Sequence, residues 1–233
     1  MMRLLAMLFG VSCLLFAAGE VPQTDEAPQT VQVTHTERVD FPAGGTLRLK
    51  NSMGELTIEG WDRPDVEITT IKSTALAVAS RDRDKASHQL EKVRVSVAPQ
   101  GSDLVITTEF PRHHFLFLKW GLWPASDLDL EYRIKVPMNA KVDVDQIAGE
   151  VHLENLTSDI RAVDHNGFIS LLLPQDGQYD IDAKAKLGDV VSDFPGHGNR
   201  THWFGHQFVQ ATKAAHQLYL RTSFGDIVIY KNR

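Results

Sequence analysis

Paired carboxylates are the residues of this sequence whose types and spacing could carry out chemistry. Asp143 with Asp145, and Asp180 with Asp182, each place two acids two positions apart. A glycosidase needs two carboxylates about 5 to 9 Å apart that face each other across the scissile bond. Aliphatic residues alternate with both pairs, so on a strand the acids share the face opposite the core. We therefore expect both pairs on a solvated outer face, and polysaccharide cleavage by a hydrolase or lyase is the alternative function.

Histidines form the second candidate group. Four of the ten histidines fall in one segment, 197–216, at His197, His202, His206 and His216. Imidazoles with a neighbouring carboxylate can bind zinc, but this spacing matches no standard zinc motif. His202 and His206 would share a face only on a helix, and Gly205 disfavours one. We interpret the segment as a polar loop and assign it no metal, while its ability to bind one stays an open alternative.

Other catalytic signatures are missing from the sequence. It contains no Gly-x-Ser-x-Gly elbow, no Ser-x-x-Lys, no phosphate-binding Gly-x-x-x-x-Gly-Lys loop and no dinucleotide fingerprint. The single cysteine, Cys13, lies within an apolar N-terminal run and not in the remainder of the chain. We therefore predict a protein that is not an enzyme and that has no cofactor.

Composition limits the class of protein further. The chain has 233 residues, of which 42% are hydrophobic and 23% charged, so one domain can build a core without disulfides or metals. These values exclude wholesale disorder, a collagen and a multi-span membrane protein. The net charge of −6, from 30 acids against 24 bases, gives no basic surface for nucleic acid.

The N-terminus has the pattern of an export signal. Arg3 precedes an apolar run over 4–18, which ends in Ala17-Ala18-Gly19. A basic start, an apolar run of about 15 residues and a small-residue exit are typical of a cleaved signal peptide, here 1–19. Retention as an uncleaved anchor is the alternative. We expect export to the periplasm or cell surface, a flexible spacer over 20–30 that is rich in Pro, Gln and Thr, and no stable membrane span after cleavage.

From residue 31 to 233 the pattern predicts one all-β domain. Segments that alternate apolar and polar residues recur at 46–50, 66–69, 93–97, 104–109, 128–136, 141–145, 150–154, 169–173, 179–185, 218–222 and 227–230. One short amphipathic helix is expected at about 80–92, where Ala86, Leu90 and Val93 share a side.

A glycine repeat is the most informative feature. The pattern Gly-acid-aliphatic begins at Gly54, Gly149, Gly188 and Gly225, and Gly167 starts a variant without the acid. Average residue frequencies predict roughly half an occurrence in a chain of this length. Steps of 18, 21 and 37 residues separate the last four glycines along the chain. A step near 20 residues with a glycine turn and a short strand suggests a β-solenoid or β-helix-like stack, with the glycines at its corners.

At these residues the chain resembles a known family. The segment Asn51-Ser52-Met53-Gly54-Glu55-Leu56-Thr57-Ile58-Glu59-Gly60-Trp61-Asp62 resembles the opening motif of the bacterial putative adhesin family, which includes LiaG-like proteins. The segment Tyr132-Arg133-Ile134-Lys135-Val136-Pro137 also resembles that family, and the resemblance covers about residues 35 to 233. It implies an exported, solenoid-like envelope domain of unknown function, without catalytic residues.

Two short segments also resemble motifs of polygalacturonases, which are β-helix enzymes. They are Gly196-His197-Gly198 and Arg133-Ile134-Lys135. That family has the two motifs in the opposite order and carries separate Asn-Thr-Asp and Asp-Asp motifs, both of which are missing here. This resemblance therefore implies no catalytic residue.

Two aromatic clusters interrupt the β pattern, one over 110–123 and one at 203–208. Their most prominent members are Trp120, Trp123, Trp203 and Phe204. We favour a role in capping an end of the stack, and a binding surface for envelope polysaccharide or another envelope protein is the alternative. Taken together, the sequence predicts an exported, adhesin-like binding or scaffolding protein, or a partner of an envelope signalling system.

Overall fold

The computed structural model describes residues 29–74, 77–110, 128–201 and 204–232. The predicted signal peptide and all but the last two residues of the predicted spacer lie outside these ranges. The described chain is mostly β with one short helix, as expected. Its N-terminal elements are β1 (Gln32–Asp40), β2 (Thr46–Trp61), β3 (Asp65–Ser73), the 3-10 turn η1 (Ser80–Asp82), α1 (Arg83–Glu91), β4 (Arg94–Gln100), β5 (Asp103–Glu109) and β6 (Asp129–Pro137).

The C-terminal part adds nine strands. They are β7 (Lys141–Glu154), β8 (Ile160–Asp164), β9 (Gly167–Pro174), β10 (Tyr179–Gly188), β11 (Val190–Ser192), β12 (His197–Arg200), β13 (Phe204–Gln210), β14 (His216–Phe224) and β15 (Ile227–Asn232). Among the described residues, no helix is long and apolar enough to cross a membrane.

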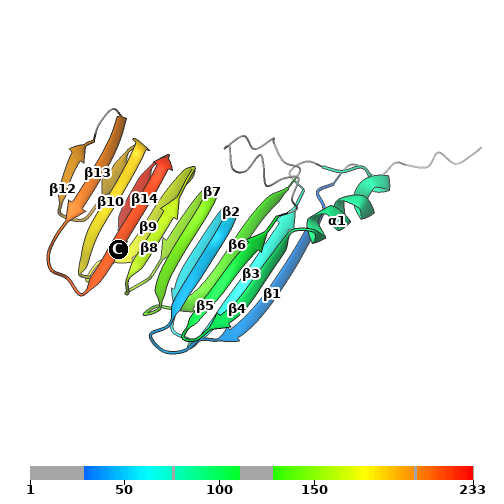
Figure 1. Ribbon diagram of the computed structural model, residues 1–233, viewed down its shortest axis with the longest axis horizontal. Helices are drawn as coiled ribbons and strands as arrows, with labels where there is room; N and C mark the ends of the chain where they lie inside the picture. Colours follow the sequence, from blue (N-terminus) through cyan, green and yellow to red (C-terminus); the bar gives the residue numbers. More distant parts are fainter. Residues whose placement is uncertain (1–28, 75–76, 111–127, 202–203, 233) are drawn as a thin grey trace, which may run out of the picture.

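All fifteen strands are hydrogen-bonded into one large mixed sheet. Its main order is β1-β3-β6-β2-β7-β8-β14-β10-β13-β12, and β4, β5, β9, β11 and β15 branch from this path. In Figure 1 the strands form an elongated row, with β12 and β13 at one end and β1 and α1 at the other. The helix buries Leu90, which fits the predicted amphipathic segment.

Parallel pairing dominates the middle of the row. The first part of β2 pairs with β5 and with the first part of β7, and its second part pairs with β6 and the second part of β7. Farther along, separate strands replace these halves, because β8, β14 and β10 continue the first part while β9, β15 and β11 continue the second. Each unit therefore consists of two strand segments with a corner between them.

The order of the units in space differs from their order in the chain. The β14–β15 unit lies between β8–β9 and β10–β11, although it comes last in sequence. The 37-residue step from Gly188 to Gly225 therefore does not hold two successive coils. It contains the hairpin of β12 and β13, which pairs antiparallel to β10 and covers the edge that β10 would otherwise expose.

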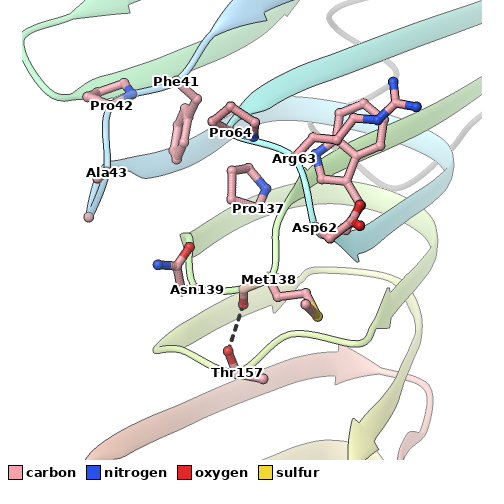
Figure 2. Close-up of a pocket in the computed structure, with 12 residues that line it drawn as sticks. Phe41, Pro42, Ala43, Asp62, Arg63, Pro64, Pro137, Met138, Asn139 and Thr157 are labelled. Carbon is pink, nitrogen blue, oxygen red and sulfur yellow. Dashed lines mark hydrogen bonds between the residues drawn. The ribbon is translucent and has the colours of Figure 1, made fainter.

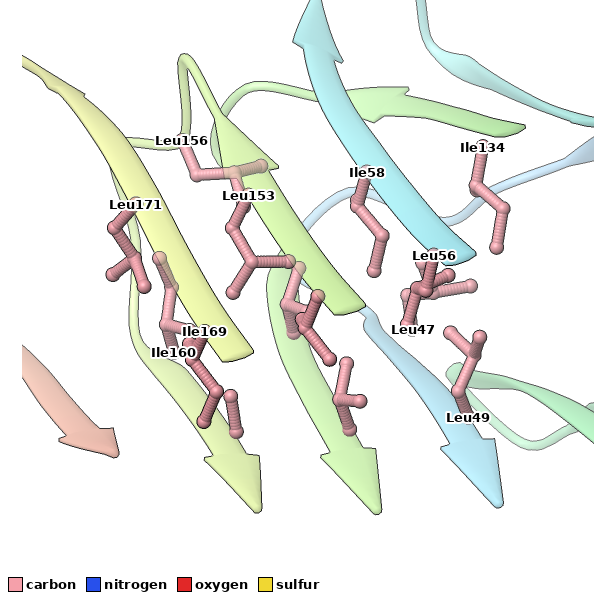
Figure 3. Close-up of a cluster of buried hydrophobic side chains, with 14 of the residues drawn as sticks. Leu47, Leu49, Leu56, Ile58, Ile134, Leu153, Leu156, Ile160, Ile169 and Leu171 are labelled. Atoms are coloured by element: carbon pink, nitrogen blue, oxygen red, sulfur yellow. The ribbon is translucent and has the colours of Figure 1, made fainter. Parts of the chain in front are cut away.

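The core lies between the two sets of strand segments. Inward-facing residues from both parts of β2, such as Leu47 and Ile58, are fully buried and belong to one hydrophobic cluster. Figure 3 shows these side chains with those of neighbouring strands, among them Leu153 and Ile169. Each fully buried aliphatic side chain contributes about 1.5–3 kcal/mol relative to an exposed one, so this core is the main source of stability.

The five repeat glycines lie in one row at the corners. Register places Gly54 beside Gly149 and Gly149 beside Gly167. A Cβ atom on any of the last four would overlap the carbonyl oxygen of a neighbouring glycine in the row. Four of the five have φ between +96° and +142°, and Gly167 is the exception. Glycine is therefore required here both for close backbone approach and for positive φ.

Candidate binding surface

Three exposed hydrophobic side chains form a row on neighbouring strands. Register pairs Leu187 of β10 with Phe224 of β14 on one side and with Phe204 of β13 on the other. Their exposed fractions are 56% for Phe224, 40% for Leu187 and 75% for Phe204. We call these three residues the apolar row. Single exposed apolar residues are ordinary, but three in adjacent register positions indicate an interaction surface.

The apolar row contains one residue that the sequence suggested and two that it did not. Phe204 belongs to the predicted aromatic surface, whereas Trp120, Trp123 and Trp203 lie outside the described residues. Leu187 and Phe224 each stand directly before a corner glycine. The sequence signal that could have identified Leu187 and Phe224 is therefore their position directly before a repeated glycine. At Leu187 the pairing register shifts at the following glycine, so simple alternation does not assign its face.

A ladder of ion pairs lies on the outer face of β5, β2, β7 and β8. Arg48 donates from Nε to Asp103 and from Nη1 to Asp143, each over 2.8 Å, and Arg161 donates to Asp143 over 2.9 Å. The hydrogen bond from Arg48 lowers the pKa of Asp103 below its usual range. The ladder joins β5, β2, β7 and β8, so Asp143 is held between two guanidinium groups.

The other candidate carboxylates are also engaged. Asp182 accepts hydrogen bonds from Arg221 and from the Gln207 amide. Asp180 accepts backbone N–H donors of Thr212 and Ala214, which lower its pKa. Asp145 lies 3.4 Å from a ring nitrogen of His165. These contacts assign positioning and ion-pair roles to the acids and bring no opposed pair together across a cleft.

The three described histidines of 197–216 are dispersed over three strands. His206 on β13 contacts Asp189 and accepts a 3.2 Å hydrogen bond from Nε of Arg200. His216 on β14 has its Nδ1 atom 3.9 Å from a carboxylate oxygen of Asp159. His197 is on β12, and His202 lies outside the described residues. Within the described ranges, no three His, Cys, Asp or Glu side chains gather in a way that could hold a metal.

A groove with a volume of about 530 Å³ lies at the turns that follow β1, β2 and β6. Figure 2 shows Pro64 and Pro137 with Met138 and Asn139 around it. Thr157 donates a 3.1 Å hydrogen bond to the backbone carbonyl of Met138 and so fixes one wall. The groove is lined mostly by apolar residues, with Asp62 and Arg63 as its charged members.

A row of buried polar side chains lines the inside of the glycine corners. Ser52 donates to Gln146, whose amide donates to the carbonyl oxygen of Gly54 over 3.0 Å. Register continues the row through Asp164 and Thr222. Asp164 is fully buried and accepts the Asn166 N–H over 3.1 Å through Oδ1, while its Oδ2 has no hydrogen-bond partner. Burial raises the pKa of Asp164 to about 7.

Comparison with known proteins supplies structural neighbours but no close relative. No protein-family model and no curated protein matches the chain. It is similar to the crystal structure of a putative cell adhesion protein from Clostridium sporogenes, at 14% identity and a TM-score of 0.53, over 86% of this chain and 100% of that one. A putative adhesin from Bacteroides fragilis matches at 10% identity and a TM-score of 0.32, over 84% of this chain and 97% of that one.

The comparison bears on the expected resemblance. The structure of a putative bacterial cell adhesion protein is thus similar to this chain, in agreement with the resemblance that the sequence suggested. Because the identities are low, the similarity extends to the fold alone. This chain has the fold of the putative cell adhesion protein from Clostridium sporogenes.

Proposed function

We propose that this chain is an exported, adhesin-like protein of the bacterial cell envelope that binds a partner through the repetitive outer surface of a solenoid-like β scaffold. The observation that carries the proposal is the apolar row of Phe204, Leu187 and Phe224. The shared fold with a putative cell adhesion protein supports it independently. The partner is an envelope polysaccharide or another envelope protein, met in the periplasm or at the cell surface.

The apolar row suits binding because its residues contribute little to the fold. Each keeps two fifths or more of its surface in water, although it stands in a strand of the sheet. Removing apolar surface from water is favourable by about 25 cal/mol per Å², before the entropy costs of association are subtracted. Aromatic side chains at the centre of an interface supply a large share of binding energy. A partner that covers all three side chains therefore gains affinity without any change in the scaffold.

Binding without turnover is the better explanation of the carboxylates. Asp143 and Asp182 are each engaged by arginine, and Asp180 is engaged by backbone donors. A glycosidase acid must be free to give up its proton at the bond being cleaved, and its partner must face it. The arrangement of these acids supports a structural role, so the proposed function is non-enzymatic.

Co-sedimentation with isolated cell envelopes tests the proposal. The purified protein is mixed with envelopes over a range of concentrations, and the supernatant is assayed for new reducing ends and unsaturated sugars. Saturable sedimentation without sugar release supports the proposal. Release of sugars would replace it with the enzymatic alternative, and a protein that neither sediments nor releases sugars would contradict it.

A further inference from the structure

A basic pocket lies on the outer face of β8, β14 and β10. Its volume is about 350 Å³, at the lower end of the range of about 300 to 1,000 Å³ for small-ligand sites. The side chains that define its chemistry are Arg161, His165, Lys184, Lys186, Tyr219 and Arg221. Three neighbouring strands supply all of these residues except His165, which directly follows β8, so the sheet holds the other five in fixed positions.

The lining is cationic although the protein is acidic. Four permanently charged cations line the pocket, while the whole chain carries a net charge of −6. The lining includes a single carboxylate, Asp164, which is fully buried beneath it. A polyanion is therefore repelled by the average surface and attracted locally at this pocket.

The four cations differ in how far their charge is already used. Arg221 donates to the side chain and backbone carbonyl of Asp182, and Arg161 donates one N–H to Asp143 while 48% of its side chain stays exposed. Among the described residues, no carboxylate lies within ion-pair distance of Lys184 or Lys186. The two lysines therefore bring unneutralised charge to the pocket.

An aromatic platform lies beside the arginines. The ring centroid of Tyr219 lies 3.9 Å from the guanidinium carbon of Arg221 and 5.8 Å from that of Arg161. These cation–π contacts hold the ring in place, and 42% of the residue remains exposed. A fixed aromatic ring with neighbouring cations presents an apolar body and charged donors to the same ligand.

The pocket and the apolar row use alternating positions of the same strands. Lys186 precedes Leu187, and Ser223, which lines the pocket, precedes Phe224, so side-chain alternation turns the two sets to opposite faces. A ligand of the pocket must offer negative groups to the lysines together with an apolar C–H face to Tyr219, and it must lie along an open sheet. Acidic polysaccharides have this combination, because each sugar ring carries C–H groups and a uronate ring also carries a carboxylate.

From this juxtaposition we infer that the protein binds an anionic, carboxylate-bearing polysaccharide, with its acid groups at Lys184 and Lys186 and a sugar ring on Tyr219. The inference rests on the proposed function and names a ligand class for the outer surface of the scaffold. Charge-assisted hydrogen bonds to carboxylate supply the specificity. Binding therefore weakens with added salt, because Lys186 is exposed to solvent and Lys184 is partly exposed.

The test is a calorimetric titration of the purified protein with polygalacturonate, a carboxylated polymer, and with neutral dextran. We expect binding to polygalacturonate at 50 mM salt, weaker binding at 300 mM and none to dextran. The variant K184Q/K186Q loses about tenfold in affinity, since two charge contacts at the protein surface are removed. The matched control K50Q/K85Q makes the same charge change at exposed lysines outside the pocket and keeps the affinity within about twofold.

A second variant and a second ligand complete the test. Tyr219→Ala lowers the affinity at both salt concentrations, because it removes the platform rather than charge. Equal losses in K184Q/K186Q and K50Q/K85Q, or no binding to polygalacturonate, would overturn the inference. Binding to phosphatidylglycerol vesicles but not to the polymer would overturn it in favour of a lipid surface. Envelope sedimentation that persists without polymer binding would overturn this inference and leave the proposed function standing.

Discussion

The backbone of Gly149 lies so close to the carbonyl oxygen of Gly54 that a Cβ atom at position 149 would overlap it. The same relationship links Gly167 to Gly149 and Gly225 to Gly167. Each of these contacts joins residues in adjacent units of the row of strands, although Gly54 and Gly149 are far apart in sequence. The closeness of the corners therefore sets how tightly neighbouring units can stack.

Gly149→Ala tests this stacking. Gly149 has φ of +125°, so alanine there meets both a disfavoured backbone conformation and a clash with another backbone. We expect the free energy of unfolding to fall by about 2 to 4 kcal/mol, measured by urea denaturation. Gly198→Ala is the control, because a Cβ there meets no atom within 4 Å. Equal stability of the two variants would show that the glycine row does not limit packing.

Asp164 predicts a pH dependence of stability. Its pKa is about 7 in the folded protein against a usual value of 3.8, so the folded state favours the protonated form. The contribution of Asp164 to the free energy of unfolding is fully present below pH 4. It decreases by up to about 4 kcal/mol as the pH rises to about 7. Asp164→Asn removes this loss and is therefore the more stable protein at pH 8. Urea denaturation from pH 4 to pH 8 measures the effect.

The control for this prediction is Asp145→Asn, because Asp145 is exposed. It should follow the wild-type profile. A wild-type protein that gains stability between pH 4 and pH 7 relative to Asp164→Asn would contradict the buried, protonated state of Asp164.

Tyr132 tests a buried hydrogen bond. Its hydroxyl lies 2.7 Å from Oγ1 of Thr108, and both residues are buried. Burial raises the pKa of Tyr132 to about 12. Tyr132→Phe leaves the Thr108 hydroxyl without this partner, and we expect a loss of about 1 to 2 kcal/mol in thermal or urea unfolding. Tyr230→Phe alters an exposed tyrosine and should change stability by less than about 0.5 kcal/mol.

Asp143 distinguishes a structural carboxylate from a catalytic one. Its side chain is partly exposed and shared by Arg48 and Arg161. Surface ion pairs contribute little, so Asp143→Asn should cost no more than about 1 kcal/mol and leave envelope binding intact. The measurements are urea unfolding and co-sedimentation. If sugar release from envelopes were detected and this variant abolished it, the structural assignment would be wrong.

Much of the fold could be predicted because burial imposes a strict local pattern. Alternation located strand segments such as 141–145 and 169–173, and the spacing of Ala86 and Leu90 located the helix. The order of the units could not be predicted, since two parallel strands can pair whether they are near to or far from each other in the sequence. Nothing in 216–232 indicates that β14 and β15 insert between two earlier units.

The candidate surface was harder to predict than the fold. Phe204 stood out as one aromatic residue within a cluster, but Leu187 resembled an ordinary inward-facing strand residue. Its exposure depends on the corner that follows it, which is a property of the assembled sheet. The basic pocket likewise combines Arg161 of β8 with Lys184 of β10. These residues share one pocket because β14 pairs with both β8 and β10.

The most direct test of the central claim compares envelope binding by the wild-type protein and by the triple variant F204S/L187S/F224S. V191S/Y230S serves as the control, because it removes exposed apolar side chains from β11 and β15, outside the apolar row. Circular dichroism establishes that all three proteins are folded. The account predicts at least a tenfold weaker affinity for the triple variant and an unchanged affinity for the control. Equal affinity of all three proteins would contradict it.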